Sequence, residues 1–242
     1  MMDGTRRSFD LEAIRADFPI LSREVHGKPL VYLDSAASAQ KPAEVLDALM
    51  SAYQDTYANV HRGLHFLSEA STDLYEAVRG KVAGFIGAAS GDEIVLTSGA
   101  TMSLNLIARC WAQPRLQSGD EILISIAEHH ATIVPWQMVA EATGARVRAF
   151  TLEDDGAFSM ARLKAEMAER TCIISVPHVS NVLGTVFPVA EIAELAHDAG
   201  ALMVVDGCQG VVHMPIDVTA LGADFYVFSA HKLYGPNGVG VL

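Results

Sequence analysis

The sequence has 242 residues, which is enough for one large α/β domain and leaves little for a second. Half of the residues are hydrophobic and 19% are charged, a balance that excludes a largely disordered chain. The 29 acidic and 17 basic residues give a net charge of -12, which argues against a nucleic-acid partner and against an anionic membrane surface.

The first residues and the cysteines indicate the compartment. Met1 to Asp10 carry charges but no apolar core of a signal peptide, and no apolar run approaches membrane-spanning length. Cys110, Cys172 and Cys208 have no metal-like spacing, and no His-x-x-x-His pair falls on a predicted helix, so no metal site is expected. We therefore expect a protein of the reducing cytoplasm.

Short apolar stretches alternate with helical periodicity along the chain, which is typical of a mostly parallel sheet wrapped by helices. The predicted strands are residues 30–33, 93–97, 121–126, 146–150, 171–176, 202–205 and 225–228. The predicted helices are residues 42–56, 69–86, 101–112, 133–143, 159–169 and 189–199. The sequence thus predicts an α/β fold with a mostly parallel, seven-stranded sheet in a large domain of residues 31–242, preceded by an N-terminal segment of residues 1–30.

The last residues, Gly238-Val239-Gly240-Val241-Leu242, have the pattern of a strand that is just beginning. Complete domains usually cover a bare apolar strand end, because its backbone groups would pair with other chains. We therefore expect that the large domain is incomplete at its C-terminus and that something which normally follows is missing.

The first candidate site is the turn Ser98-Gly99-Ala100-Thr101, between a predicted strand and a predicted helix. A turn of small residues that opens a helix presents free N–H groups and the positive end of the helix dipole to an anion. The Thr101 hydroxyl adds a donor. An ordinary N-cap turn is the alternative for this segment alone.

Further polar residues follow the next strands. Glu128-His129-His130 follows the strand of residues 121–126, and a flat imidazole there could stack on a planar cofactor. His178 and Asn181 follow the strand of residues 171–176. Packing or solvent-exposed histidines, and a turn-stabilising asparagine, are the ordinary alternatives.

An aspartate and a lysine end the last two predicted strands. Asp206 follows Ala201-Leu202-Met203-Val204-Val205, and Lys232 comes shortly after Phe225-Tyr226-Val227-Phe228. A lysine in an apolar pocket can form a Schiff base with a carbonyl. A carboxylate can hold a pyridinium nitrogen protonated, which pyridoxal phosphate requires as an electron sink. Together the two residues nominate pyridoxal 5'-phosphate as the cofactor.

Functional candidates therefore follow five separate strands, which end near residues 97, 126, 176, 205 and 228. In an open α/β sheet, ligands bind outside the carboxyl ends of the strands. Chemically compatible groups at five such ends favour a cofactor site over unrelated polar loops.

Four motifs resemble those of the SufS/CsdA-type (group II) cysteine desulfurases, which belong to the class V aminotransferase superfamily of fold-type I pyridoxal phosphate enzymes. The resemblance runs from about Phe18 to the last residue. The motifs are Tyr32-Leu33-Asp34-Ser35-Ala36-Ala37-Ser38, Asn59-Val60-His61-Arg62-Gly63, Glu128-His129-His130-Ala131 with Val134-Pro135-Trp136-Gln137, and Ser229-Ala230-His231-Lys232-Leu233-Tyr234-Gly235-Pro236.

The resemblance implies a role for each matching residue. Lys232 would form the Schiff base and take the substrate α-proton, and Asp206 would pair with the ring nitrogen. Gln209 would bond the phenolic oxygen, and His129 would stack on the ring. The phosphate would be held by Ala100 (through its backbone), Thr101, Ser229 and His231.

Two further residues would serve the substrate, according to the same resemblance. Asn181 would contact the cofactor or the substrate carboxylate, and His61 would lie near the substrate. The family also carries a C-terminal domain with an arginine for the carboxylate and a cysteine that becomes a persulfide, and neither follows Lys232 here. Cys208 is the one cysteine near the expected site, and we expect it to be structural.

The resemblance implies conversion of L-cysteine to L-alanine by a homodimer that passes sulfur to an acceptor protein for iron–sulfur cluster assembly. This chain would supply the cofactor-binding part, and we expect that it does not sustain desulfuration alone. A selenocysteine lyase or another class V aminotransferase-like enzyme is one alternative. A non-catalytic fragment that binds a cofactor or a partner is the other.

Overall fold

The computed structural model describes residues 9–242. Its main sheet has seven strands in the order β3-β9-β8-β7-β6-β4-β5. These strands are β3 (Leu96–Thr97), β4 (Glu121–Ser125), β5 (Arg146–Phe150), β6 (Thr171–Pro177), β7 (Leu202–Asp206), β8 (Phe225–Ser229) and β9 (Gly240–Val241). Strands β8, β7, β6, β4 and β5 are parallel, whereas β9 is antiparallel to both of its neighbours.

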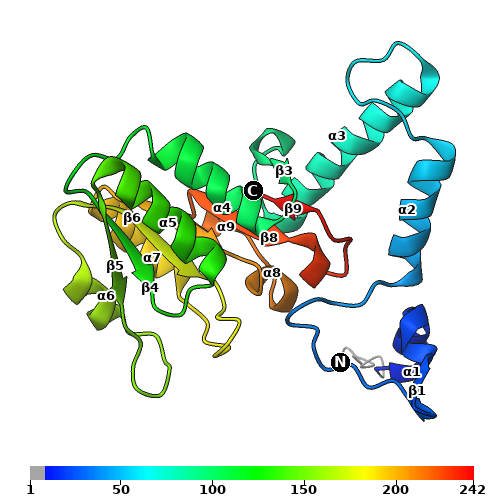
Figure 1. The fold of residues 1–242 in the computed structure, drawn as a ribbon, viewed down its shortest axis with the longest axis horizontal. Coiled ribbons are helices and arrows are strands. Elements are labelled where there is room, and N and C mark those ends of the chain that lie inside the picture. The colour runs from blue at the N-terminus through cyan, green and yellow to red at the C-terminus, as the bar shows by residue number, and fades with distance from the viewer. Residues whose placement is uncertain (1–8) are drawn as a thin grey trace, which may run out of the picture.

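Helices cover both faces of this sheet (Figure 1). The longer helices are α2 (Ala43–Asp55), α3 (Phe66–Ile86), α4 (Ala100–Leu106), α5 (His130–Thr143), α6 (Met160–Glu166) and α7 (Val189–Asp198). Helix α4 continues into a π-helical turn (Ile107–Ala112) that packs with α5 on one face, while α7 contacts β7 and the short α9 (Val218–Leu221) on the other. The remaining short pieces are α1 (Leu11–Ala16), α8 (Gly210–His213) and the 3₁₀ turns Pro19–Ser22, Gly91–Glu93 and Ala230–Lys232.

The central strands are buried because both of their faces are covered. Ile173, Ile174, Met203 and Val204 are at most 1% exposed. Each such side chain contributes about 1.5–3 kcal/mol by leaving water. This burial on both faces explains why β6 and β7 are nearly continuous apolar runs rather than alternating ones.

The predicted fold class is confirmed, but one predicted strand is wrong. Residues 30–33 form no strand of the sheet: the Leu30 N–H donates to the Arg23 carbonyl at 2.9 Å, and Val31 and Leu33 are 76% and 93% exposed. An apolar run becomes a strand only where another strand accepts its hydrogen bonds, and here the neighbouring β2 (Lys28–Pro29) pairs with β1 (Glu24–Val25) instead. The seventh strand of the sheet is β9, which lies within the predicted strand start at residues 238–242.

Most predicted helices are confirmed with shifted ends. Helix α5 begins at His130, three residues before the predicted start, because the ring of His129 caps it by accepting the Ala131 N–H at Nδ1. It ends as predicted at Gly144, whose φ of 77° is a left-handed conformation that favours glycine. Helix α6 stops at Glu166 rather than at residue 169.

Helices α2 and α3 extend away from the sheet (Figure 1). Helix α2 has no buried residue, and α3 buries only Ser68, Ala83 and Ile86. Within residues 9–242 no helix combines the length and the hydrophobicity that a bilayer crossing requires.

Gly240 of β9 packs against the backbone of Gly99 at the start of α4, and we expect Gly240→Ala to be destabilising. A Cβ atom there would lie 2.4 Å from the backbone of Gly99, so the contact must open by a backbone shift. We expect a loss of about 1–3 kcal/mol in the free energy of unfolding, measured by urea denaturation. The control is Gly80→Ala in α3, where a Cβ meets nothing within 4 Å and a gain of about 0.5–1 kcal/mol is expected. Equal effects at both sites would contradict this packing argument.

Candidate active site

A cavity of about 450 Å³ opens at the carboxyl edge of the parallel strands, a volume typical of small-molecule sites. Nine of the ten sequence-predicted site residues line it, and only His61 does not. The full lining is Asp34, Ala36, Ala37, Ala100, Thr101, His129, Ala131, Pro177, Val179, Asn181, Asp206, Cys208, Gln209, Ser229, His231 and Lys232.

One corner of the cavity is built from the start of α4 and the end of β8. The Ala100 N–H donates to Ser229 Oγ at 2.8 Å, so these two elements, 129 residues apart, are tied together. Thr101 and His231 line the same cavity. Hydroxyls, an imidazole and a helix start are the donors that an anionic group such as a phosphate prefers.

Asp206 forms a second corner at the end of β7. Its side chain is only 8% exposed, and Oδ1 accepts the N–H of Cys208 at 2.9 Å. In the parallel sheet Asp206 pairs with Pro177 of β6 and with Val227 of β8. The carboxylate is thus held on rigid backbone at the cavity wall, where it can face a cationic ring nitrogen.

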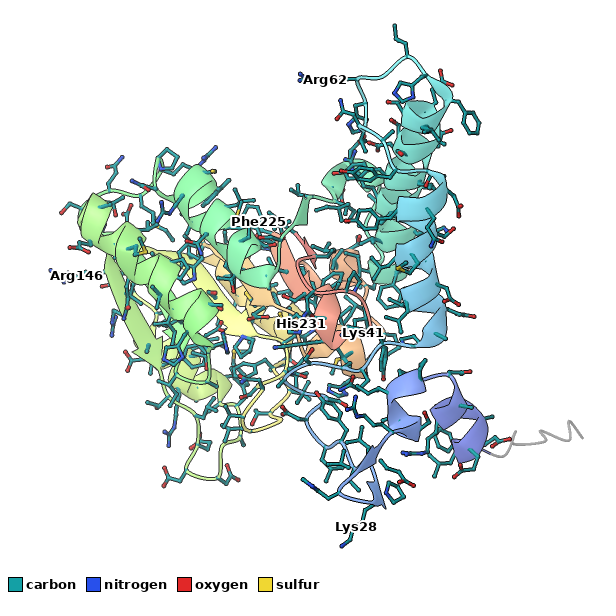
Figure 2. The ribbon with its side chains drawn as sticks, turned by 45° about the vertical axis from the view of Figure 1, so that its right-hand side comes forward. Lys28, Lys41, Arg62, Arg146, Phe225 and His231 are labelled. Atoms are coloured by element: carbon teal, nitrogen blue, oxygen red, sulfur yellow. The ribbon has the colours of Figure 1, made fainter. Side chains whose placement is uncertain are left out.

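Lys232 belongs to the 3₁₀ turn Ala230–Lys232, which residues 38–41 of the loop before α2 hold in place. The His231 carbonyl accepts hydrogen bonds from the Ala39 N–H at 3.0 Å and from Lys41 Nζ at 3.2 Å. Ser38 Oγ lies 3.3 Å from His231 Nδ1. Figure 2 shows Lys41 and His231 next to each other. This clamp fixes the backbone that carries the Lys232 amine.

The remaining predicted residues have definite local partners. His129 Nδ1 accepts the Ala131 N–H at 3.1 Å, which places the proton of a neutral ring on Nε2. Gln209 donates from Nε2 to the Ala36 carbonyl at 2.9 Å. Asn181 is exposed in the loop after β6. All three side chains line the cavity with room for a ligand among them.

His61 lies elsewhere, in the loop before α3. Its Nε2 is 2.7 Å from Glu76 Oε1, and its ring contacts Tyr75 edge-on at a centroid distance of 5.4 Å. Its φ of 70° is unusual for a residue other than glycine. Figure 2 shows the neighbouring Arg62 at the tip of this extended arm. In this structure His61 therefore does not line the cavity, and its role near the substrate stays a prediction.

Sequence reasoning assigned no role to several residues of the site. Asp34, Ala36 and Ala37 line the cavity, although their motif was noted only as a resemblance. His178 Nδ1 lies 3.0 Å from the Tyr226 hydroxyl, and His178 directly follows Pro177 of the cavity lining. Burial lowers the pKa of His178, while burial and then Asp206 raise the pKa of Tyr226. The signal for this pair was a tyrosine inside an apolar strand, since a buried phenol needs a partner.

The site and the fold match known proteins. A cysteine desulfurase from Enterobacter sp. (strain 638) is 53% identical over 97% of this chain and 58% of its own length, and one from Shigella sonnei (strain Ss046) is 52% identical with the same coverage. The solved structure of the cysteine desulfurase CsdA from Escherichia coli, in an S-sulfonic acid form, superposes with a TM-score of 0.86 at 45% identity, over 96% of this chain and 57% of that one. The apo cysteine desulfurase from Thermococcus onnurineus NA1 gives 0.87 at 38%, over 96% and 56%.

The fold and the cavity thus have their counterparts among α/β enzymes that depend on pyridoxal phosphate. The model of the aminotransferase class V family matches residues 31–242, and the chain belongs to that family. The chain spans a little under three fifths of the length of the curated relatives that it matches.

The residues present fit the cofactor of this family. A lysine amine, a buried carboxylate and a donor-rich corner surround one cavity, and these groups could meet the aldehyde, the ring nitrogen and the phosphate of pyridoxal phosphate. The carboxylate is backbone-anchored, and the lysine turn is clamped from the N-terminal side.

Cys208 lines the cavity, but we expect it to react poorly. Burial and then the charge of Asp206 raise the pKa of its thiol well above the usual value, so little thiolate is present at neutral pH. With iodoacetamide at pH 8, native protein should be labelled at the exposed Cys110 at least tenfold faster than at Cys208. Peptide mapping by mass spectrometry gives both rates, and urea-unfolded protein is the control. Comparable native rates would show that the Cys208 thiol is accessible.

Proposed function

We propose that the whole protein is a pyridoxal phosphate-dependent cysteine desulfurase, which converts L-cysteine to L-alanine and retains the sulfur as an enzyme persulfide. Residues 31–242 are its cofactor-binding domain, and residues 1–30 are the segment before it. The observation that carries the proposal is the convergence of Lys232, Asp206 and His129 on one cavity. The names of relatives that are more than 50% identical support this choice of reaction.

In this proposal the chain's own residues divide the work. Bound pyridoxal phosphate supplies an electron sink for the charge that develops at the substrate α-carbon. Lys232 would hold the cofactor through Nζ, and the same amine would accept the substrate α-proton. Asp206 would favour a positive charge at the ring nitrogen, Gln209 would donate to the phenolic oxygen, and His129 would stack on the ring. The phosphate would be held by Ala100, Thr101, Ser229 and His231.

The substrate and partner assignments rest on the family. Asn181 contacts the cofactor or the substrate carboxylate, and His61 lies near the substrate in the whole protein. We propose a cytoplasmic homodimer that passes sulfur to an acceptor protein for iron–sulfur cluster assembly. One alternative uses the same cofactor chemistry: a selenocysteine lyase or a different class V enzyme. Comparing alanine release from L-cysteine with that from L-selenocysteine distinguishes a desulfurase from a selenocysteine lyase. A fragment that binds cofactor without turnover is the alternative of another class.

We expect Lys232→Ala to lose the covalent cofactor. Wild-type protein with pyridoxal phosphate should show the yellow absorbance of a lysine-bound cofactor, and borohydride reduction should fix the label on Lys232. The matched control is Lys164→Ala on α6, outside the cavity lining, which should keep the absorbance. If the yellow band survives in Lys232→Ala and reduction labels another lysine, the assignment is wrong.

We expect Asp206→Asn to bind cofactor but to exchange the substrate α-proton slowly. Asparagine keeps the shape and removes the charge that stabilises a protonated ring, so exchange of L-cysteine in heavy water should slow by about 10²-fold or more, equivalent to roughly 3 kcal/mol. Proton NMR of the α-hydrogen measures the rate. Unchanged exchange would exclude this role for Asp206.

The reaction itself is tested with a chimera. This chain alone should release no alanine catalytically from L-cysteine, because Cys208 is the one cysteine at the cavity and its thiol is buried and protonated. Adding the part of the Enterobacter relative that extends beyond the aligned region should restore alanine and sulfide formation in the presence of a reductant. The same chimera with Lys232→Ala is the control. Sustained turnover by the chain alone that Cys208→Ser abolishes would show that Cys208 is the sulfur acceptor.

A further inference from the structure

A second acid lies close behind the cavity wall. Glu128 is in the loop between β4 and α5, is only 8% exposed, and does not line the cavity. Among the described residues, neither of its carboxyl oxygens has a hydrogen-bond partner. A carboxylate that is buried without hydrogen-bond partners has lost its hydration without any compensating interaction, so its presence requires a physical explanation.

The groups that surround Glu128 are polar but carry no positive charge. The hydroxyls of Thr132 on α5 and Ser175 on β6 face Glu128; both are fully buried and have no hydrogen-bond partner among residues 9–242. The backbone N–H of His129, the next residue in the same loop, is also close to the Glu128 carboxyl group. The charged group that acts on it is Asp206 at the end of β7. Its surroundings therefore favour a neutral acid and offer hydroxyl oxygens to which a carboxyl O–H can donate.

Asp206 has a hydrogen-bond partner and access to the cavity, and among residues 9–242 Glu128 has neither. Asp206 borders the open cavity, and its Oδ1 accepts the Cys208 N–H at 2.9 Å. Burial, and after it the charge of Asp206, raise the pKa of Glu128 well above the ordinary value. Two neighbouring carboxyl groups at a buried site do not both ionise, and the proton stays on the one with the poorer environment for charge.

We propose that Glu128 and Asp206 form a carboxyl pair that holds one proton, with the proton on Glu128 and the negative charge on Asp206 at the cavity wall. Glu128 is then a positioning residue that acts through Asp206. It confines the charge of the pair to the one place that can face a ligand cation and prevents a second buried negative charge. The identification of that cation as a ring nitrogen rests on the proposed function. The proposal that Glu128 and Asp206 share a proton does not depend on it.

The direct test is infrared spectroscopy of purified, cofactor-free protein at neutral pH. A protonated carboxyl has a carbonyl stretch that shifts in heavy water, and ionised carboxylates do not contribute to it. We expect this band in the wild type, its loss in Glu128→Gln, and its retention in Glu141→Gln, which changes an exposed glutamate on α5, the helix that follows Glu128. No band in the wild type, or a band that survives Glu128→Gln, overturns the proposal.

A second measurement tests the coupling within the pair and does not depend on how Glu128→Gln folds. The pH at which the wild-type band disappears reports the pKa of Glu128. In Asp206→Asn the nearby negative charge is gone while burial is unchanged, so the midpoint should fall by about one pH unit or more. An unchanged midpoint would show that Asp206 does not influence Glu128.

The two proposals can fail separately. If the band and its shift are found but Lys232 does not bind pyridoxal phosphate, the carboxyl pair stands and the proposed function falls. If cofactor binds to Lys232 but no protonated carboxyl is seen, the function stands and the pair falls. Repeating the infrared titration with cofactor bound should lower the midpoint of Glu128, since a ring cation beside Asp206 offsets its charge. An unmoved midpoint would contradict the link between the pair and the ring.

Discussion

The parallel register of β6, β7 and β8 is the constraint on which the site depends. Pro177 pairs with Asp206, and Asp206 pairs with Val227, so the three strands end at one level of the sheet. Because parallel strands present their carboxyl ends at the same edge, residues separated by more than a hundred positions meet there without any long-range side-chain network. The antiparallel β9 adds the last piece, since Gly240 packs against Gly99 at the start of α4.

The electrostatics of the cavity follow from this arrangement. Burial first and Asp206 second raise the pKa of Glu128, Cys208 and Tyr226. Burial lowers the pKa of His231, and Lys232 and then Lys41 lower it further. The carboxyl groups of Asp34 and Asp206, the amine of Lys232 and several N–H and O–H donors thus line one cavity. Such a lining complements a ligand that carries both a cationic and an anionic group.

The N-terminal part of the chain contributes unevenly. Ser38, Ala39 and Lys41 hold the His231 backbone and side chain, so a loop before the large sheet fixes the backbone next to Lys232. The helices that follow behave differently, because α2 gains no stabilisation from buried side chains within this chain and the strained His61 lies on the arm that joins it to α3. The Enterobacter relative matches this chain over only 58% of its own length, so the structure shows the arm without most of the remaining part of such a relative.

The sequence alone determined the fold class and most of the site, since buried parallel strands are apolar runs and the polar residues that end them share one edge. Lys232, Asp206 and His129 could be found for this reason. Only the tertiary structure decided that residues 30–33 stay outside the main sheet, because pairing depends on a partner strand and not on the run itself. It also decided that His61 lies away from the cavity and that Glu128 lies buried near Asp206. Such proximities arise from loops and helix ends, whose paths no local periodicity encodes.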